Sequence, residues 1–208
     1  MDLKAVAEEH YREVESDLQA ISTWMYENPE TGYQEFETSA KLAQFLRNQG
    51  FAVEHPAWGL DTAFDAVAGS TGPEVVICAE LDALPEVGHA CGHNIIATAA
   101  AGAGVALLPL VDELGIKVRV LGTPAEETFG GKVDLIDAGA FASADAAMMI
   151  HPTPTDMVDP QVLAVAHLDV AFHGKESHAA FAPQISRNAL DAAVQAYNNV
   201  SMLRQKLY

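Results

Sequence analysis

Short apolar segments typical of buried strands alternate with helical patterns along the middle of the chain. Residues 74–81, 116–124 and 144–152 are strand-like, whereas residues 94–108 and 130–139 between them have the pattern of helices. Strands that are joined by helices form parallel sheets, and the helices then cover the faces of the sheet. The sequence therefore predicts an α/β fold with a mostly parallel sheet and helices on both faces.

Two further helices are expected before this alternation. Apolar residues recur at three- and four-residue steps from Leu3 to Met25, which indicates an amphipathic helix. Pro29 and Gly32 interrupt the pattern, and a second helical pattern runs from Phe36 to Leu46. Gly50 follows as a stop signal.

The pattern changes near residue 160. The proline-containing segment 151–160 is followed by alternating apolar and polar residues over 163–173, which is typical of a half-exposed strand. A helix containing Leu190 and Val194 is expected after a polar turn. These changes predict a first domain over residues 1–160 and the beginning of a second over 161–208, which is too small to hold a core alone.

The charge and cysteine content exclude several classes of function. Acidic residues number 29 against 11 basic ones, and the resulting net charge of −18 argues against nucleic-acid and membrane-surface partners. Two cysteines are too few for a secreted disulfide scaffold. Because no signal pattern and no apolar run of about 18–20 residues is visible, we expect a cytoplasmic protein without a membrane span.

Polar side chains follow three of the predicted strands. Glu80 and Asp82 end the first, Glu126 and Glu127 follow the second, and His151 follows the third. Ligands of open parallel sheets bind at the carboxyl ends of the strands. Each cluster alone has an ordinary explanation as a solvated surface or loop, but three clusters at the same edge predict a functional site.

The segment 88–94, GHACGHN, contains His89, Cys91 and His93 together with two glycines. Cys91 is compatible with a nucleophile that uses His93 or His89 as its base, a redox thiol, a metal ligand or a small packed residue. A nucleophile leaves the neighbouring carboxylates without a role, and Cys78, the second cysteine, is predicted to lie inside a strand. A metal site uses the thiolate, imidazole and carboxylate groups together, so it is the favoured interpretation, and a cysteine hydrolase remains the less favoured alternative.

Several longer motifs resemble one family of enzymes. They cover residues 80–99, 122–141, 148–152, 174–183 and 187–192. They are similar to the dinuclear metallopeptidases of the aminoacylase, glutamate carboxypeptidase and hippurate hydrolase type, and most similar to the aminobenzoyl-glutamate hydrolase and Xaa-Arg dipeptidase branch. The resemblance implies a zinc-exopeptidase-like catalytic domain followed by an inserted α+β dimerisation domain.

The resemblance also implies a metal site and its ligands. The expected ligands are Cys91, His93, Glu127 and His151. Zn²⁺ is the expected metal, with two ions in the full site of the family, and Mn²⁺ or Co²⁺ are alternatives.

The same resemblance assigns roles around the metals. Glu126 is the expected general base, and Asp82 is expected to orient a ligand or to tune the base. His178 is expected to bind substrate and to stabilise the oxyanion, and Asn188 is expected near the substrate carboxylate. The implied reaction is hydrolysis of an amide or peptide bond in a small N-acyl amino acid or dipeptide.

Members of this family are about twice as long as this chain, given ordinary domain sizes. We therefore expect the chain to correspond to the N-terminal half and to lack a later histidine ligand. A homodimer is the expected assembly in the family. The alternative to catalysis is a truncated chain that binds metal or a partner subunit without turnover.

Overall fold

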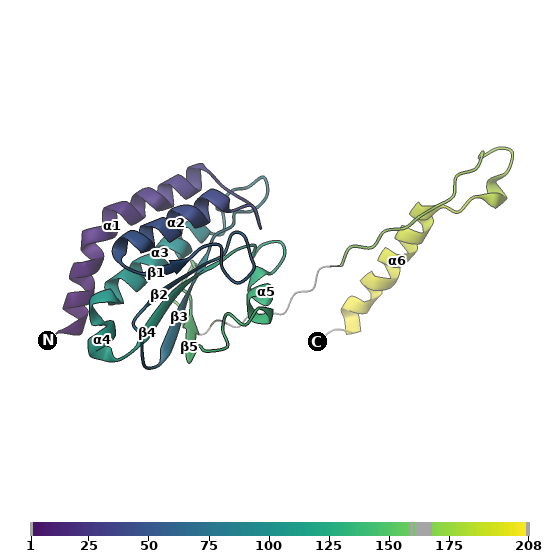
Figure 1. Cartoon of the computed structure of the whole chain (residues 1–208). Coiled ribbons are helices and arrows are strands. Elements are labelled where there is room, and N and C mark those ends of the chain that lie inside the picture. Colours follow the sequence, from purple (N-terminus) through teal and green to yellow (C-terminus); the bar gives the residue numbers. More distant parts are fainter. Residues whose placement is uncertain (1, 159, 161–167, 207–208) are drawn as a thin grey trace. The chain divides into compact units, whose positions relative to one another are not determined.

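The computed structural model describes residues 2–158, 160 and 168–206. The contacts divide the chain into two compact units, Met1–Asp156 and Met157–Tyr208. Each unit is described by itself, since their positions relative to one another are not determined (Figure 1).

The first unit is built on a mixed five-stranded sheet with the order β1-β2-β4-β3-β5. The strands are β1 (Ala52–Glu54), β2 (Phe64–Ala68), β3 (Glu74–Glu80), β4 (Lys117–Thr123) and β5 (Ala146–Met148). β3 pairs in parallel with both β4 and β5, which confirms the predicted parallel strands. β1 and β2 extend the sheet in antiparallel pairing, and neither strand was predicted from the sequence.

Helices cover both faces of this sheet, as predicted. They are α1 (Leu3–Glu27), α2 (Phe36–Gln49), α3 (His93–Leu107), α4 (Val111–Leu114) and α5 (Gly131–Asp137), with a 3-10 turn at Leu108–Leu110. α1, α2 and α3 lie on one face and enclose the larger core with the sheet (Figure 1). Leu135 of α5 packs on the opposite face against Val76, Cys78 and Leu121. The prediction that Cys78 lies inside a strand is confirmed, and its side chain is buried in this smaller core.

Small residues let α3 approach its neighbours closely. A Cβ atom on Gly104 would lie 2.4 Å from Val120 Cγ2, and one on Gly102 would lie 2.9 Å from a Leu18 methyl group. The helical stretch His93–Leu114 is long and apolar enough to cross a membrane, contrary to the expectation from the sequence. In the most apolar part of this stretch 61% of the residues are buried inside the unit, so core packing accounts for the apolar composition.

A buried ion-pair network crosses the sheet away from the large core. Arg119 on β4 contacts Asp65 on β2 at 2.6 Å and Glu74 on β3 at 2.6 Å. Lys117 and Ser143 also donate hydrogen bonds to Glu74. Burial would raise the pKa of Glu74, but these donors outweigh it and lower the pKa to about 2.

The second unit contains α6 (Ala189–Leu203), with 3-10 turns at Pro183–Ile185 and Arg204–Lys206. α6 confirms the predicted helix. The predicted strand over 163–173 is wrong where it can be checked: residues 168–173 are not a strand, and residues 163–167 lie outside the described residues. A strand is stabilised by a paired neighbour. In the described part of this unit, the only bridge joins Lys175 to Arg187.

Candidate metal centre

The expected site residues of the first unit come together where three parallel strands end. Asp82 follows β3, Glu126 and Glu127 follow β4, and His151 follows β5. His93 is the first residue of α3, and the glycine before it has a positive φ of 85°. The turn from β3 into α3 therefore brings the imidazole of His93 back over the strand ends.

The His93 side chain is fully buried and oriented by Asp82. Its Nδ1 atom lies 3.2 Å from Asp82 Oδ1. The Nε2 atom consequently faces three carboxylates: it lies 3.2 Å from Glu80 Oε2, 3.6 Å from Glu127 Oε1 and 3.8 Å from Glu126 Oε2. A carboxylate on one ring nitrogen and a free second nitrogen is the usual arrangement of a metal-binding histidine.

Three buried atoms in this cluster lack hydrogen-bond partners within the described residues. They are His93 Nε2, Glu80 Oε2 and Glu127 Oε1. Burying polar atoms without partners is costly, and native proteins rarely do so without a ligand, ion or water to satisfy them. His93 Nε2 lies 3.2 Å from Glu80 Oε2 and 3.6 Å from Glu127 Oε1, so the unsatisfied nitrogen faces two oxygen donors and these residues fit a metal ion.

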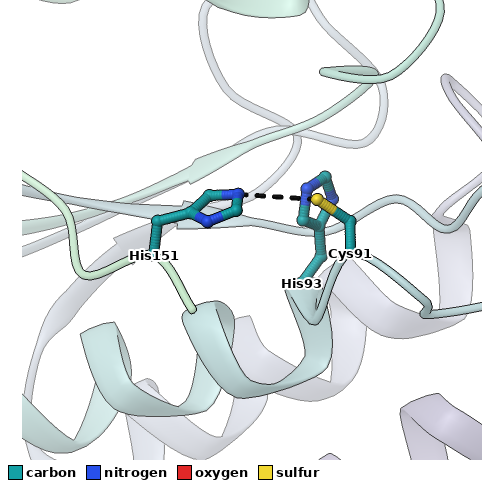
Figure 2. A group of neighbouring side chains, drawn as sticks. All are labelled: Cys91, His93 and His151. Carbon is teal, nitrogen blue, oxygen red and sulfur yellow. Dashed lines mark hydrogen bonds between the residues drawn. The ribbon is translucent and has the colours of Figure 1, made fainter. Parts of the chain in front are cut away.

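Cys91 and His151 extend the cluster toward solvent. Figure 2 shows the His151 ring pointing toward the Cys91 sulfur, and Nε2 lies 3.5 Å from Sγ. His151 Nδ1 lies 2.9 Å from its neighbour's carbonyl oxygen, which leaves Nε2 as the atom that faces the cluster.

Two groups of potential ligands therefore share His93. One contains Cys91, His93 and His151, and the other contains Glu80, His93 and Glu126; within each group the ligand atoms lie within 4.8 Å of one another. Thiolate, imidazole and carboxylate form the donor set that Zn²⁺ prefers, and two overlapping groups have the composition of a two-metal site.

The turn that carries Glu126 and Glu127 is fixed by backbone hydrogen bonds. Glu127 N–H donates to Asp82 Oδ2 at 2.9 Å, so Asp82 orients both His93 and this turn. Ala125 has a positive φ of 57°, and its N–H donates to the buried Glu35 carboxylate at 2.8 Å. The two glutamates are thus presented by a backbone that side chains from other parts of the unit hold in place.

Burial and the crowded carboxylates shift the pKa values of the cluster. Burial raises the pKa of the Cys91 thiol to about 12, and Glu127 and Glu126 add to the shift. For His93, burial alone would lower the pKa, but the hydrogen bond to Asp82 and the charges of Glu80 and Asp82 raise it. Burial also raises the pKa of Glu126, and the charge of Glu80 reinforces it. Burial and the neighbouring negative charges thus act together, and a bound cation relieves the excess negative charge.

The same values argue against a cysteine nucleophile. A reactive cysteine needs a lowered pKa and a base within reach, whereas the pKa of Cys91 is raised to about 12. His89, one candidate base, is buried, and burial lowers its pKa to about 4. The raised pKa of Cys91 therefore argues against nucleophilic catalysis, and the cysteine hydrolase stays the less favoured alternative.

The two remaining expected residues belong to the second unit. His178 Nδ1 accepts hydrogen bonds from the backbone N–H groups of Ala180 and Phe181 at 3.2 and 3.3 Å. Asn188 is the N-cap of α6, and its side chain accepts from Leu190 N–H at 3.0 Å. Within this unit each side chain therefore has a local backbone partner, and their expected roles toward substrate stay predictions.

Sequence reasoning did not assign three residues that shape the site. Glu80 faces His93, Lys132 of α5 contacts Glu80, and Glu35 holds the turn before Glu126. The position of Glu80 at the end of β3 was a usable signal. Lys132 and Glu35 reach the site only through the packing of α5 and of the segment before α2, which no local pattern reveals.

Comparisons with known proteins identify a family and relatives of the chain. A model of peptidase family M20/M25/M40 matches residues 76–206. The chain is 40% identical to a Xaa-Arg dipeptidase of Mus musculus over 99% of this chain and 51% of that protein. It is 31% identical to a p-aminobenzoyl-glutamate hydrolase protein of Escherichia coli (strain K12), over 93% of this chain and 45% of that protein.

A solved structure agrees with the fold. The YXEP protein of Bacillus subtilis, described as a dinuclear metal-binding peptidase from the M20 family, superposes with a TM-score of 0.62 at 28% identity, over 69% of this chain and 44% of that one. The chain thus spans about half the length of the relatives that it matches. The family match over most of its length shows that the chain belongs to peptidase family M20/M25/M40.

Proposed function

We propose that the protein carries out metal-dependent hydrolysis of an amide or peptide bond in a small dipeptide or N-acyl amino acid. The observation that carries the proposal is the buried His93 Nε2 atom, which has no hydrogen-bond partner in the described residues. It faces the carboxylates of Glu80, Glu126 and Glu127. Cys91 and His151 complete a donor set suited to two Zn²⁺ ions. The relatives named as dipeptidase and aminobenzoyl-glutamate hydrolase support the class of substrate.

The proposed mechanism gives the two adjacent glutamates different roles. When bound, the metal ions would supply Lewis-acid polarisation of the scissile carbonyl and a lowered pKa for water. Glu127 Oε1 lies 3.6 Å from His93 Nε2, and the resemblance assigns the ligand role to Glu127, although the group of potential ligands around His93 contains Glu126 instead. Glu126 is 42% exposed at the side chain, so its carboxylate reaches solvent and can take a proton from water and return it to the leaving amine. His178 and Asn188 are proposed to contact substrate, as the resemblance of their segment implies.

Two matched variants test this division. Glu126→Gln is expected to retain bound metal and to lose hydrolysis by roughly 10²- to 10⁴-fold, the usual contribution of a general base. Glu127→Gln, one residue away, is expected to lose metal as well as activity. Metal content of the purified protein and hydrolysis of dipeptides and N-acyl amino acids are the measurements. Unchanged hydrolysis by Glu126→Gln would disprove the role of the base.

A second candidate function is metal binding without turnover. The chain spans about half the length of its relatives, so the groups described in it need not make a complete catalytic site. Bound metal in the purified protein, together with no hydrolysis of the same substrates, would support this candidate. Homodimer formation is proposed from the family resemblance and is tested by the mass of the protein in solution.

A further inference from the structure

The segment before α2 touches both loops of the candidate centre. Glu30 C=O accepts from Ala83 N–H at 2.7 Å, next to Asp82, and Glu35 Oε1 accepts from Ala125 N–H at 2.8 Å, next to Glu126. The residues between these anchors include none of the expected metal ligands. The segment therefore connects the loop after β3 to the loop after β4 from outside the ligand set.

Glu35 is the inner anchor of this segment. Its side chain is fully buried, and Oε2 has no hydrogen-bond partner in the part of the chain that the structure describes. Burial raises the pKa of Glu35, and the hydrogen bond from Ala125 partly offsets the shift. A buried carboxyl group that accepts a backbone N–H from a residue 90 positions away has a specific structural task.

That task concerns a turn with an uncommon backbone. Ala125 adopts a positive φ of 57°, a region that residues other than glycine enter rarely and at a cost. Its carbonyl oxygen accepts from the N–H groups of Phe129, Gly130 and Gly131 at 3.3, 2.9 and 3.2 Å. The Ala125 N–H is thus the point at which Glu35 holds the start of a tightly folded loop.

Packing around the turn leaves little room for another path. A Cβ atom on Gly32 would lie 2.3 Å from Thr128 Oγ1 and 3.2 Å from Ala125 Cα. The Tyr33 ring stacks on Phe129 with centroids 5.5 Å apart. The segment before α2 therefore fits against the loop at both ends, with Glu35 supplying the buried hydrogen bond.

We infer that Glu35 is a positioning residue: its hydrogen bond to Ala125 N–H holds the turn that sets Glu126 and Glu127 toward His93. The inference rests on the proposed function for its consequence at the metals. Its structural part is independent, because neither partner in the hydrogen bond, Glu35 Oε1 or Ala125 N–H, belongs to an expected metal ligand.

Two substitutions distinguish the effect of the length of the Glu35 side chain from the effect of its negative charge. Glu35→Gln keeps the length of the side chain and an oxygen acceptor, whereas Glu35→Asp keeps the carboxylate but shortens the side chain by one methylene group. If Glu35 acts by holding the turn, Gln preserves its effect and Asp abolishes it; if it acts by charge, the order is reversed. Glu74→Asp is the matched control, since Glu74 is also buried but contacts Lys117, Arg119 and Ser143.

The first measurement is amide hydrogen exchange at Ala125 in the metal-free protein. We expect Glu35→Asp to accelerate exchange at least about tenfold relative to Ala79 in β3, and Glu35→Gln to leave it near the parent rate. The second is the affinity for Co²⁺ and its visible absorption spectrum, which report the ligand geometry. Glu35→Asp is expected to weaken Co²⁺ binding roughly 10- to 100-fold and to change the spectrum, which is the usual effect of losing a residue that orients the metal ligands.

Parent-like exchange and binding in Glu35→Asp would overturn the inference. So would equal losses in both Glu35 variants, or the same changes in Glu74→Asp at matched thermal stability. If the parent binds no Co²⁺, the proposed function fails, and the exchange rates alone still decide the role of Glu35.

Discussion

Asp82 illustrates how one buried side chain organises two parts of the centre. One oxygen faces His93 Nδ1 and the other accepts from Glu127 N–H. Burial would raise the pKa of Asp82, but His93 and the backbone N–H groups outweigh it and lower the pKa. The residue is therefore an anion with two acceptors in use, and an amide cannot replace it without turning a donor toward one of its partners.

At the residue scale, we predict that Asp82→Asn weakens Zn²⁺ binding by roughly 10- to 100-fold, because either His93 or the Glu127 turn loses its acceptor. Zn²⁺ titration by competition with a chelating dye measures the effect. Asp61→Asn, at an exposed position, is the control for the loss of one negative charge. Equal affinities in the two variants would show that Asp82 matters only through its charge.

At the residue scale, the sequence predicts those site residues that stand in a recognisable local pattern. Cys91, His93, Glu126, Glu127 and His151 could be found from the sequence because each stands at a strand end or in a short motif, and the structure brings them together. Glu35 could not be found, since its contact with Ala125 depends on how α2 packs and spans 90 residues.

At the scale of the elements, the buried ion pairs connect β2, β3 and β4. The pKa of Glu74 is about 2 in the folded protein against an ordinary 4.5. A group with a lowered pKa stabilises the folded state above its ordinary pKa, and the contribution is lost as the pH falls through the folded value. The gap corresponds to about 3 kcal/mol at neutral pH.

We therefore predict that Glu74→Gln lowers the free energy of unfolding by about 3 kcal/mol at pH 7. The difference from the parent should shrink between pH 4.5 and about 2, where the parent carboxylate becomes protonated. Urea unfolding across this pH range measures both. A difference that stays constant with pH would contradict the ion-pair explanation.

The same network explains why part of the sheet was not predicted. β2 contains Asp65, which is buried against Arg119, so its sequence lacks the apolar pattern of the other central strands. β1 has only three residues. Over residues 168–173 a strand was predicted where none forms. Alternating apolar and polar residues indicate how side chains could face, but they do not provide a neighbouring strand to pair with. β3, β4, α1 and α3 were predicted because they are long and their patterns are clear.

At the scale of the whole molecule, the net charge of −18 and the crowded carboxylates favour a bound cation. The pKa of the Cys91 thiol is raised to about 12, so this side chain is protonated at neutral pH, and the pKa of His93 is raised as well. A thiol must lose its proton to bind a metal ion, so binding releases a proton and is favoured by higher pH.

We predict that Zn²⁺ stabilises the protein and does so more at pH 8 than at pH 6. A free concentration 100 times the dissociation constant corresponds to about 2.7 kcal/mol of added stability. Thermal unfolding with Zn²⁺, with Mg²⁺ as the control ion, measures the effect, and calorimetry in buffers of different ionisation enthalpy counts the released protons. Equal stabilisation at both pH values would contradict the proposed ligand role of Cys91.

The turn between β4 and α5 has a practical consequence for protein engineering. Glu35 and Asp82 hold it by the backbone N–H groups of Ala125 and Glu127, and neither hydrogen bond involves the side chains of the two glutamates. The conformation of the main chain at this turn therefore does not depend on which side chains stand at positions 126 and 127. Positions 126 and 127 can be randomised together to select variants with other metal preferences or other reactions, while the scaffold that supports them is left intact.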